Sequence, residues 1–158
     1  MKRILIFAEQ KNGTIHRVTY ELIGKSLELL QSSQGEIDVV LLGDKNICTD
    51  ELQQHQIDNI YHIEGDCFDK PDELLYKENI VSLINEISPE IFLIGATTFG
   101  RSLAPRIAAA LNAGLTADCT ELKLDDDGEL IQIRPAFSDN ILAHIKTTTR
   151  KSAIKINN

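Results

Sequence analysis

Residues 90–122 read EIFLIGATTFGRSLAPRIAAALNAGLTADCTEL, and this stretch decides the fold class. Residues 91–94 form a short apolar run that is typical of a buried strand, and Gly95 ends it. Small and hydroxylated residues follow, and an alanine-rich pattern then predicts a helix that Gly114 closes before a second strand begins. A strand, a tight loop and a helix N-terminus in this order can direct backbone N–H groups at an anion. The stretch therefore predicts an α/β fold of the nucleotide-binding kind.

The residues before this stretch repeat the alternation of strand and helix. Apolar runs at 3–8, 37–42 and 60–63 predict three strands. Helical spacing of apolar residues predicts helices over 15–33 and 78–87, and shorter helical pieces are expected at 49–51 and 71–73. Strands that alternate with helices imply parallel pairing through right-handed crossovers. We therefore expect a three-layer parallel sheet that resembles the core of the adenine-nucleotide alpha hydrolases.

The pattern changes after Gly114. Residues 116–124 and 129–137 are two extended runs, and the sequence DDDG at 125–128 predicts a hairpin turn between them. A third run at 141–148 follows, and residues 152–156 add a last short strand. Strands joined by tight turns pair antiparallel, so we expect an antiparallel excursion at the C-terminal end of one domain, residues 1–158.

Composition excludes several classes of function. The net charge of −8 comes from 16 basic and 24 acidic residues, which argues against a nucleic-acid-binding face. The three cysteines have no CxxC spacing and the four histidines form no HExxH pair, so no metal site is expected and the histidines are interpreted as surface or sheet-edge residues. The apolar run near the amino terminus is too short for a signal peptide or a membrane span. We expect a cytoplasmic protein without membrane insertion.

The loop at 95–102 reads GATTFGRS and differs from the P-loop pattern GxxxxGK[ST] only in Arg101. The lysine of that pattern acts as a point charge on the terminal phosphates, and the planar guanidinium of arginine replaces it poorly. A P-loop NTPase is therefore disfavoured. What remains is a candidate anion or nucleotide loop made of Gly95, Thr97, Thr98, Gly100 and Arg101.

A purely structural role explains most of the same residues. Thr97 or Thr98 could cap the helix, Ser102 could do likewise, and Pro105 would be tolerated in a first helical turn. This interpretation leaves Arg101 and Arg106 as surface charges, anion contacts or contacts to a partner chain.

Other sites are weaker still. GxG occurs nowhere, so the dinucleotide fingerprint is missing, and the first loop, EQKNG, lacks a phosphate cradle. Asp118 and Glu121 lie beside the loop, but carboxylates on strands are more often solvated than catalytic. The run at 125–127 offers too few ligands for calcium. We therefore expect no catalytic residues.

Three segments resemble one family. The block GATTFGRSLAPRIAAALNAGLTADCTEL at 95–122 strongly resembles a segment of electron transfer flavoprotein alpha subunits. RPAFSDNILAHI at 134–145 is similar to the strand pair that follows it in that family, and RILIFAE at 3–9 is similar to the family's first strand. The chain departs from the family at Ser138-Asp139, where a glycine pair is usual, and in the tail KSAIKINN.

The resemblance implies a heterodimer with an electron transfer flavoprotein beta subunit. Such proteins take electrons from flavin dehydrogenases, often acyl-CoA dehydrogenases, and pass them to a membrane quinone oxidoreductase or another acceptor. The resemblance places the redox FAD of the intact heterodimer in a carboxy-terminal domain of the alpha subunit, and AMP or a second flavin in the beta subunit. It implies that residues 1–158 are the N-terminal domain and that the C-terminal FAD-binding domain is absent.

Three hypotheses follow from the residues and the resemblance together. The first is a scaffold and partner-binding domain that supports electron transfer by the flavin. The second is a stand-alone nucleotide-binding module that uses the loop at 95–102. The third, a nucleotide-cleaving enzyme on the same core, is the least favoured because the P-loop lysine is missing.

Overall fold

The computed structural model describes residues 1–31, 33–136, 138–146 and 153–157, with side chains described for 1–31, 33–117 and 119–133. Within these residues, six parallel strands form one sheet in the order β5-β4-β1-β6-β11-β7. In chain order they are β1 (Lys2–Ala8), β4 (Gly35–Gly43), β5 (Asn59–Glu64), β6 (Ile91–Gly95), β7 (Leu115–Cys119) and β11 (Ala153–Asn157). The longest helices are α1 (Val18–Leu30), α3 (Glu73–Ile87) and α4 (Thr98–Leu111).

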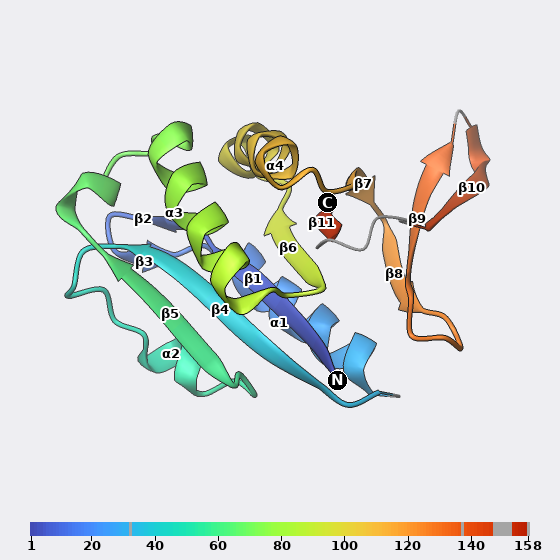
Figure 1. Ribbon diagram of the computed structural model, residues 1–158, viewed down its shortest axis with the longest axis horizontal. Coiled ribbons are helices and arrows are strands. Elements are labelled where there is room, and N and C mark those ends of the chain that lie inside the picture. The colour runs from blue at the N-terminus through green and yellow to red at the C-terminus, as the bar shows by residue number, and fades with distance from the viewer. Residues whose placement is uncertain (32, 137, 147–152, 158) are drawn as a thin grey trace.

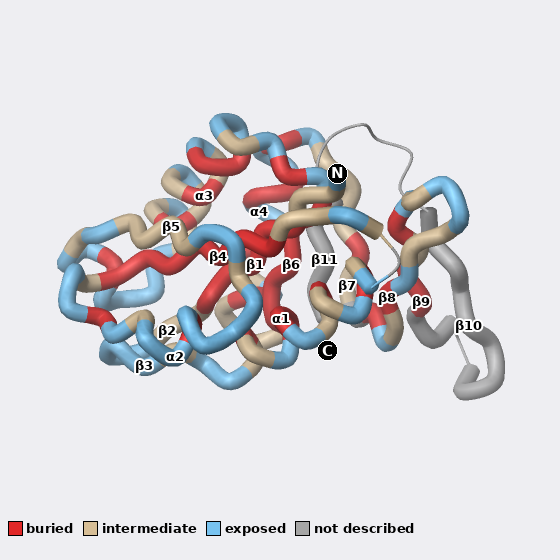
Figure 2. The backbone as a smooth tube through the Cα atoms, turned by 90° about the horizontal axis from the view of Figure 1, so that it is seen from below, coloured by how far each residue is buried: buried red, intermediate tan, exposed pale blue. Residues whose placement is uncertain are grey.

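Helices cover both faces of this sheet, which confirms the predicted three-layer architecture. Helices α3 and α4 lie on the face toward the viewer in Figure 1, and α1 lies behind the sheet. Along β1, Leu5 and Phe7 pack into the core under α3 and α4, whereas Ile4 and Ile6 pack against α1. Strands buried on both faces need continuous apolar runs. Buried backbone accordingly runs through the middle of the sheet in Figure 2.

Short elements connect these strands. The first loop, EQKNG, belongs to a small hairpin of β2 (Gln10–Lys11) and β3 (Thr14–Ile15), and Asn12 and Gly13 both have positive φ at its turn. The helical piece predicted at 49–51 is α2 (Asp50–Gln53), and a 3-10 turn, η1 (Asp66–Phe68), follows β5.

Two helix boundaries differ from those predicted. The pieces predicted at 71–73 and 78–87 are one helix, α3, because the Asp72 side chain accepts hydrogen bonds from the N–H groups of Leu74 and Leu75 and starts the helix early. Helix α4 ends at Leu111, and its C-cap is Asn112, which is left-handed at φ 51°, rather than Gly114. Asparagine tolerates this conformation, so a glycine was not required.

The antiparallel excursion is present between β7 and β11. It consists of β8 (Glu121–Leu124), β9 (Leu130–Ala136) and β10 (Ser138–Lys146), in the sheet order β10-β9-β8. The extended run predicted at 116–124 is therefore divided between β7 and β8. In the predicted hairpin turn the N–H of Asp125 donates to the Glu129 carbonyl, and Gly128 has φ 76°. Residues 137, 147, 148 and 152 of the predicted strands lie outside the described residues.

The strand order creates a switch point next to β1. The chain leaves β1 for β4 and β5 on one side, and then crosses back to β6 on the other side. Ligands of open α/β sheets bind at the carboxyl ends of the strands at such a point. The carboxyl ends of β1 and β6, where α4 begins, are therefore the first place to look for a functional site.

Candidate functional site

Thr97 joins the two strand ends at the switch point. It is the N-cap of α4, and its Oγ1 accepts a hydrogen bond from the Gly100 N–H at 3.0 Å. The same hydroxyl donates to Oε2 of Glu9, the residue that directly follows β1. The cap predicted at Thr97 or Thr98 is thus Thr97. The negative charge expected near a helix N-terminus is supplied here by the protein itself.

The glycines of the loop have a packing role. A Cβ placed on Gly100 would lie 2.0 Å from the backbone oxygen of Gly95, and one placed on Gly95 would lie 2.6 Å from Cγ1 of Val18. Both distances are well below van der Waals contact. The two glycines therefore allow α4 to approach the end of β6 and allow β6 to approach α1.

The two arginines of α4 turn toward backbone carbonyls. Arg101 Nε donates to the Ala96 carbonyl at 3.2 Å, and Arg106 Nη1 donates to the Ser102 carbonyl at 2.6 Å and approaches Ser102 Oγ at 3.1 Å. Both residues are exposed. Arg101 therefore does not reach across the loop in the manner of a P-loop lysine.

Ser102 and Pro105 differ from their predicted roles. Ser102 lies within α4, where its hydroxyl donates to Oε1 of Glu73 at 2.8 Å instead of capping the helix. Pro105 also lies inside α4, beyond its first turn, because the cap at Thr97 starts the helix earlier.

The pKa of Glu73 lies below its ordinary value, mainly because the backbone N–H of Glu73 donates a hydrogen bond to its own carboxylate. The Ser102 hydroxyl and the charge of Arg106 lower this pKa further.

An aromatic cluster fills the space beneath this loop. The Tyr76 ring makes edge contacts with Phe99 at 5.1 Å, Phe68 at 5.4 Å and Phe7 at 6.1 Å between centroids. The Tyr76 hydroxyl donates to the Phe68 carbonyl at 2.7 Å, and burial raises the pKa of this phenol. Four separate elements contribute these rings, so no local sequence pattern indicated the cluster.

The predicted loop residues therefore fall into two groups. Gly95, Thr97 and Gly100 lie together at the switch point, whereas Thr98 and Arg101 are exposed on the first turn of α4.

Two carboxylates on strands are the other candidates that the sequence raised. Glu121 pairs with Lys123 at 2.8 Å, and the Asp118 side chain lies outside the described residues.

No group of three or more metal-ligating side chains comes together in the part of the chain that the structure describes. His16 and His55 are exposed and His62 is partly buried on the edge strand β5, while the His144 side chain is not among those described. Among the described helices, none combines the length and apolar character that a membrane span requires.

Sequence similarity to known proteins covers nearly the whole chain. The chain is 40% identical over 152 residues to the electron transfer flavoprotein subunit alpha of Thermoanaerobacterium thermosaccharolyticum, which covers 95% of this chain and 46% of that protein. It is 41% identical over 152 residues to the lactate dehydrogenase (NAD(+),ferredoxin) subunit LctC of Acetobacterium woodii, covering 91% of this chain and 35% of that protein. Protein FixB of Azorhizobium caulinodans is 37% identical over 154 residues, covering 92% and 41%.

The chain thus spans less than half the length of these curated relatives. The model of the electron transfer flavoprotein domain matches residues 4–155, which run from β1 into β11. A match over nearly every described element confirms the resemblance found at 95–122 in the sequence. The chain belongs to the electron transfer flavoprotein domain family.

Proposed function

We propose that residues 1–158 are the N-terminal scaffold and partner-binding domain of an electron transfer flavoprotein alpha subunit. One observation carries this proposal: the family match covers the whole sheet, yet at its carboxyl edge two of the protein's own carboxylates, Glu9 and Glu73, accept hydrogen bonds from Thr97 and Ser102. In this role the domain supports FAD-mediated electron transfer from flavin dehydrogenases to a downstream acceptor. It acts as part of an electron carrier, without catalytic residues of its own, in the cytoplasm.

The geometry of the switch point supports placing the flavin elsewhere. A dinucleotide pyrophosphate needs N–H donors or cations, but here Glu9 bonds to Thr97, the cap of α4, and Glu73 bonds to Ser102 in its second turn. These residues do not fit a flavin dinucleotide at this edge. We infer that the FAD of the intact heterodimer is held outside residues 1–158, by a C-terminal domain of the alpha subunit. When bound, the FAD supplies the redox chemistry.

The partner in this proposal is an electron transfer flavoprotein beta subunit, which would hold AMP or a second flavin. The antiparallel excursion is the candidate contact surface. Strands β9 and β10 extend away from the parallel sheet, at the end opposite β5 (Figure 1), and within the described residues β10 pairs with β9 alone. An edge strand in a projecting hairpin presents backbone N–H and C=O groups with which a strand of a second chain can pair.

Co-expression tests this proposal. A tagged beta subunit from the same genome should retain this chain through affinity purification and gel filtration in equal molar amounts. The excursion should be needed for this, so a deletion of residues 121–146 bridged by a short Gly-Ser linker should lose the association while the parallel sheet stays folded by circular dichroism. If the tagged beta subunit is repeatedly recovered without this chain when residues 1–158 are co-expressed intact, the result would count against the proposed partner.

A stand-alone nucleotide-binding module remains the alternative. It is favoured by the position of α4, whose N-terminus lies at the switch point where such ligands bind. The loop residues it would use are Gly95, Thr97, Thr98, Gly100 and Arg101. A ligand that binds only the folded state must raise the melting temperature. A rise with millimolar AMP or ATP would favour this alternative, and no rise would favour the scaffold.

A further inference from the structure

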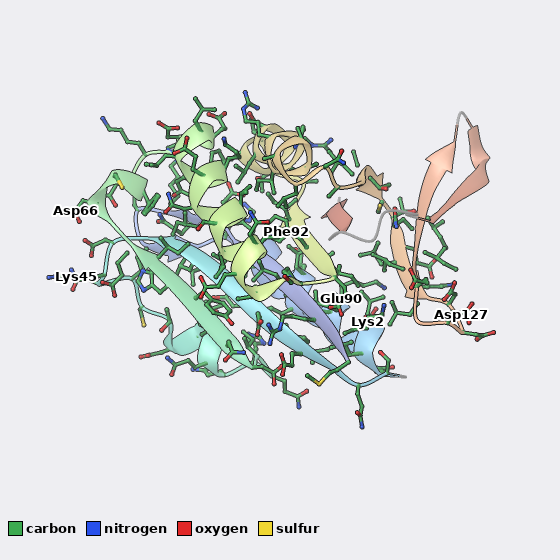
Figure 3. All side chains as sticks on the ribbon, in the orientation of Figure 1. Lys2, Lys45, Asp66, Glu90, Phe92 and Asp127 are labelled. Atoms are coloured by element: carbon green, nitrogen blue, oxygen red, sulfur yellow. The ribbon has the colours of Figure 1, made fainter. Side chains whose placement is uncertain are left out.

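A polar cluster lies inside the sheet, away from the switch point. It occupies the amino-terminal halves of β1, β4 and β5, on the face that α3 covers. This is the end of the sheet where Figure 3 labels Lys2 and Glu90, opposite the end with Lys45 and Asp66. At its centre is Asp38, whose side chain is 0% exposed and whose register partners are Leu5 and Asn59.

The two oxygens of Asp38 have unequal surroundings. Oδ1 accepts a hydrogen bond from Nδ2 of Asn59 on β5 at 2.8 Å. Oδ2 is buried and has no hydrogen-bond partner within the described residues. A buried carboxylate oxygen without a donor is costly, since nothing replaces the water that it loses.

Arg3 is the nearest cation, but its donors are directed at other acceptors. Its Nε and Nη2 both donate to Oε2 of Glu36, at 3.0 and 2.7 Å, and its Nη1 donates to the Ile87 carbonyl at 3.0 Å. The 3.4 Å between Arg3 Nε and Asp38 Oδ2 is therefore an ion-pair distance without a directed hydrogen bond. Within this cluster one guanidinium faces two carboxylates.

The remaining groups around Asp38 add negative charge. Burial raises the pKa of Asp38 above its ordinary value, and the hydrogen bond from Asn59 and the charge of Arg3 offset only part of this effect. The charges of Glu36 and Asp58 raise it further. The titratable and charged groups on the packed elements are Arg3 from β1, Glu36 from β4, Asp58 and Tyr61 from β5 and its approach, and Glu86 from α3.

We propose that Asp38 keeps its proton to a higher pH in the folded domain than in the unfolded chain, which makes this carboxyl a pH-responsive link between β4 and β5. The proton comes from solvent and neutralises the carboxylate, so that Arg3 balances Glu36 alone. When the proton leaves, a second carboxylate stays buried next to an occupied guanidinium. The hydrogen bond from Asn59 favours the ionised form, so the cost comes from the buried charge itself and lowers the free energy of local opening where β5 pairs with β4.

The direction of the pH effect follows from linkage. An aspartate in an unfolded chain titrates near pH ~3.9, and the folded form of Asp38 titrates higher. Between these two values the native state binds more protons than the unfolded state, so the stability that Asp38 contributes falls as pH rises. If the native state binds one proton more than the unfolded state, the unfolding equilibrium constant rises about tenfold for each pH unit.

Urea unfolding of the wild type and Asp38→Asn from pH 4 to 9 tests the proposal. The amide oxygen of the variant side chain can still accept the hydrogen bond from Asn59, but the amide does not titrate. The ratio of the unfolding constants, wild type over variant, should rise with pH by up to about tenfold per unit and then level off above the folded pKa. A ratio that is flat or falls with pH overturns the proposal. The matched control is Glu64→Gln, which removes one carboxylate from an exposed position at the end of β5.

A second measurement does not depend on the variant folding. The side-chain carboxyl carbon of Asp38 can be followed by NMR in the native wild type, with the Glu64 signal as an internal reference. Its titration midpoint should lie above the unfolded value of about 3.9, and the amide protons of β5 should exchange faster once that midpoint is passed. A midpoint at or below the unfolded value shows that Asp38 is ionised in the folded domain and contradicts the proposal.

Discussion

Replacing Gly100 with alanine tests whether the loop glycines serve packing. Alanine at an ordinary helix position would stabilise the fold by about 0.5–1 kcal/mol relative to glycine. At Gly100 the added Cβ would lie 2.0 Å from the Gly95 carbonyl oxygen, which is backbone at the end of a buried strand and cannot rotate away. Separating these atoms requires a shift of more than about 1 Å, and overpacking costs roughly 1–3 kcal/mol. Because the gain in helix propensity offsets part of this cost, we expect a net destabilisation of about 1 kcal/mol.

Thermal and urea unfolding measure this effect. For a chain of this size about 1 kcal/mol corresponds to a fall in melting temperature of roughly 2–4 °C. Gly24→Ala is the matched control, because a Cβ at Gly24 has no atom within 4 Å and Gly24 lies inside α1. That variant should be more stable than wild type by about 0.5–1 kcal/mol. If Gly100→Ala unfolds at or above the wild-type temperature, the close approach of α4 to β6 is refuted.

Two further substitutions test how the helices begin and end. Asp72→Ala removes the side chain that accepts from Leu74 and Leu75, and should cost about 1 kcal/mol in urea unfolding; an unchanged midpoint would contradict the cap. Asn112→Gly relieves a non-glycine residue at φ 51°, and should raise stability by several tenths of a kcal/mol, measured in the same way; a loss would show that the Asn112 side chain has another role.

Local patterns predicted most of the elements because periodicity is a local property. The apolar runs identified β1, β4, β5 and β6, and the alanine-rich stretch identified α4. The order of strands is not local. The last short strand, β11, was expected, but its place between β6 and β7 depends on contacts with segments about 40–60 residues earlier in the chain. A helix boundary was misplaced where asparagine took the position that glycine usually takes.

The site was predicted only in part for the same reason. Thr97 was one of the candidate caps because of its position before a helix, but its partner Glu9 is 88 residues away and follows a different strand. Likewise, the Asp38 cluster joins three strands and the end of α3, and a single aspartate in the apolar run IDVVLL gave no indication of it. Contacts of this kind depend on the register of the sheet, which one sequence does not reveal.

Titration calorimetry of a purified beta subunit into this chain tests the scaffold proposal most directly. We predict saturable binding at a 1:1 ratio, with a negative heat-capacity change from the apolar surface that becomes buried. We also predict that the complex gains no FAD through this chain, so that any bound flavin or AMP matches the content of the beta subunit alone. No detectable heat or complex at tens of micromolar protein, from a chain whose fold is verified by circular dichroism, would contradict the role proposed for this domain.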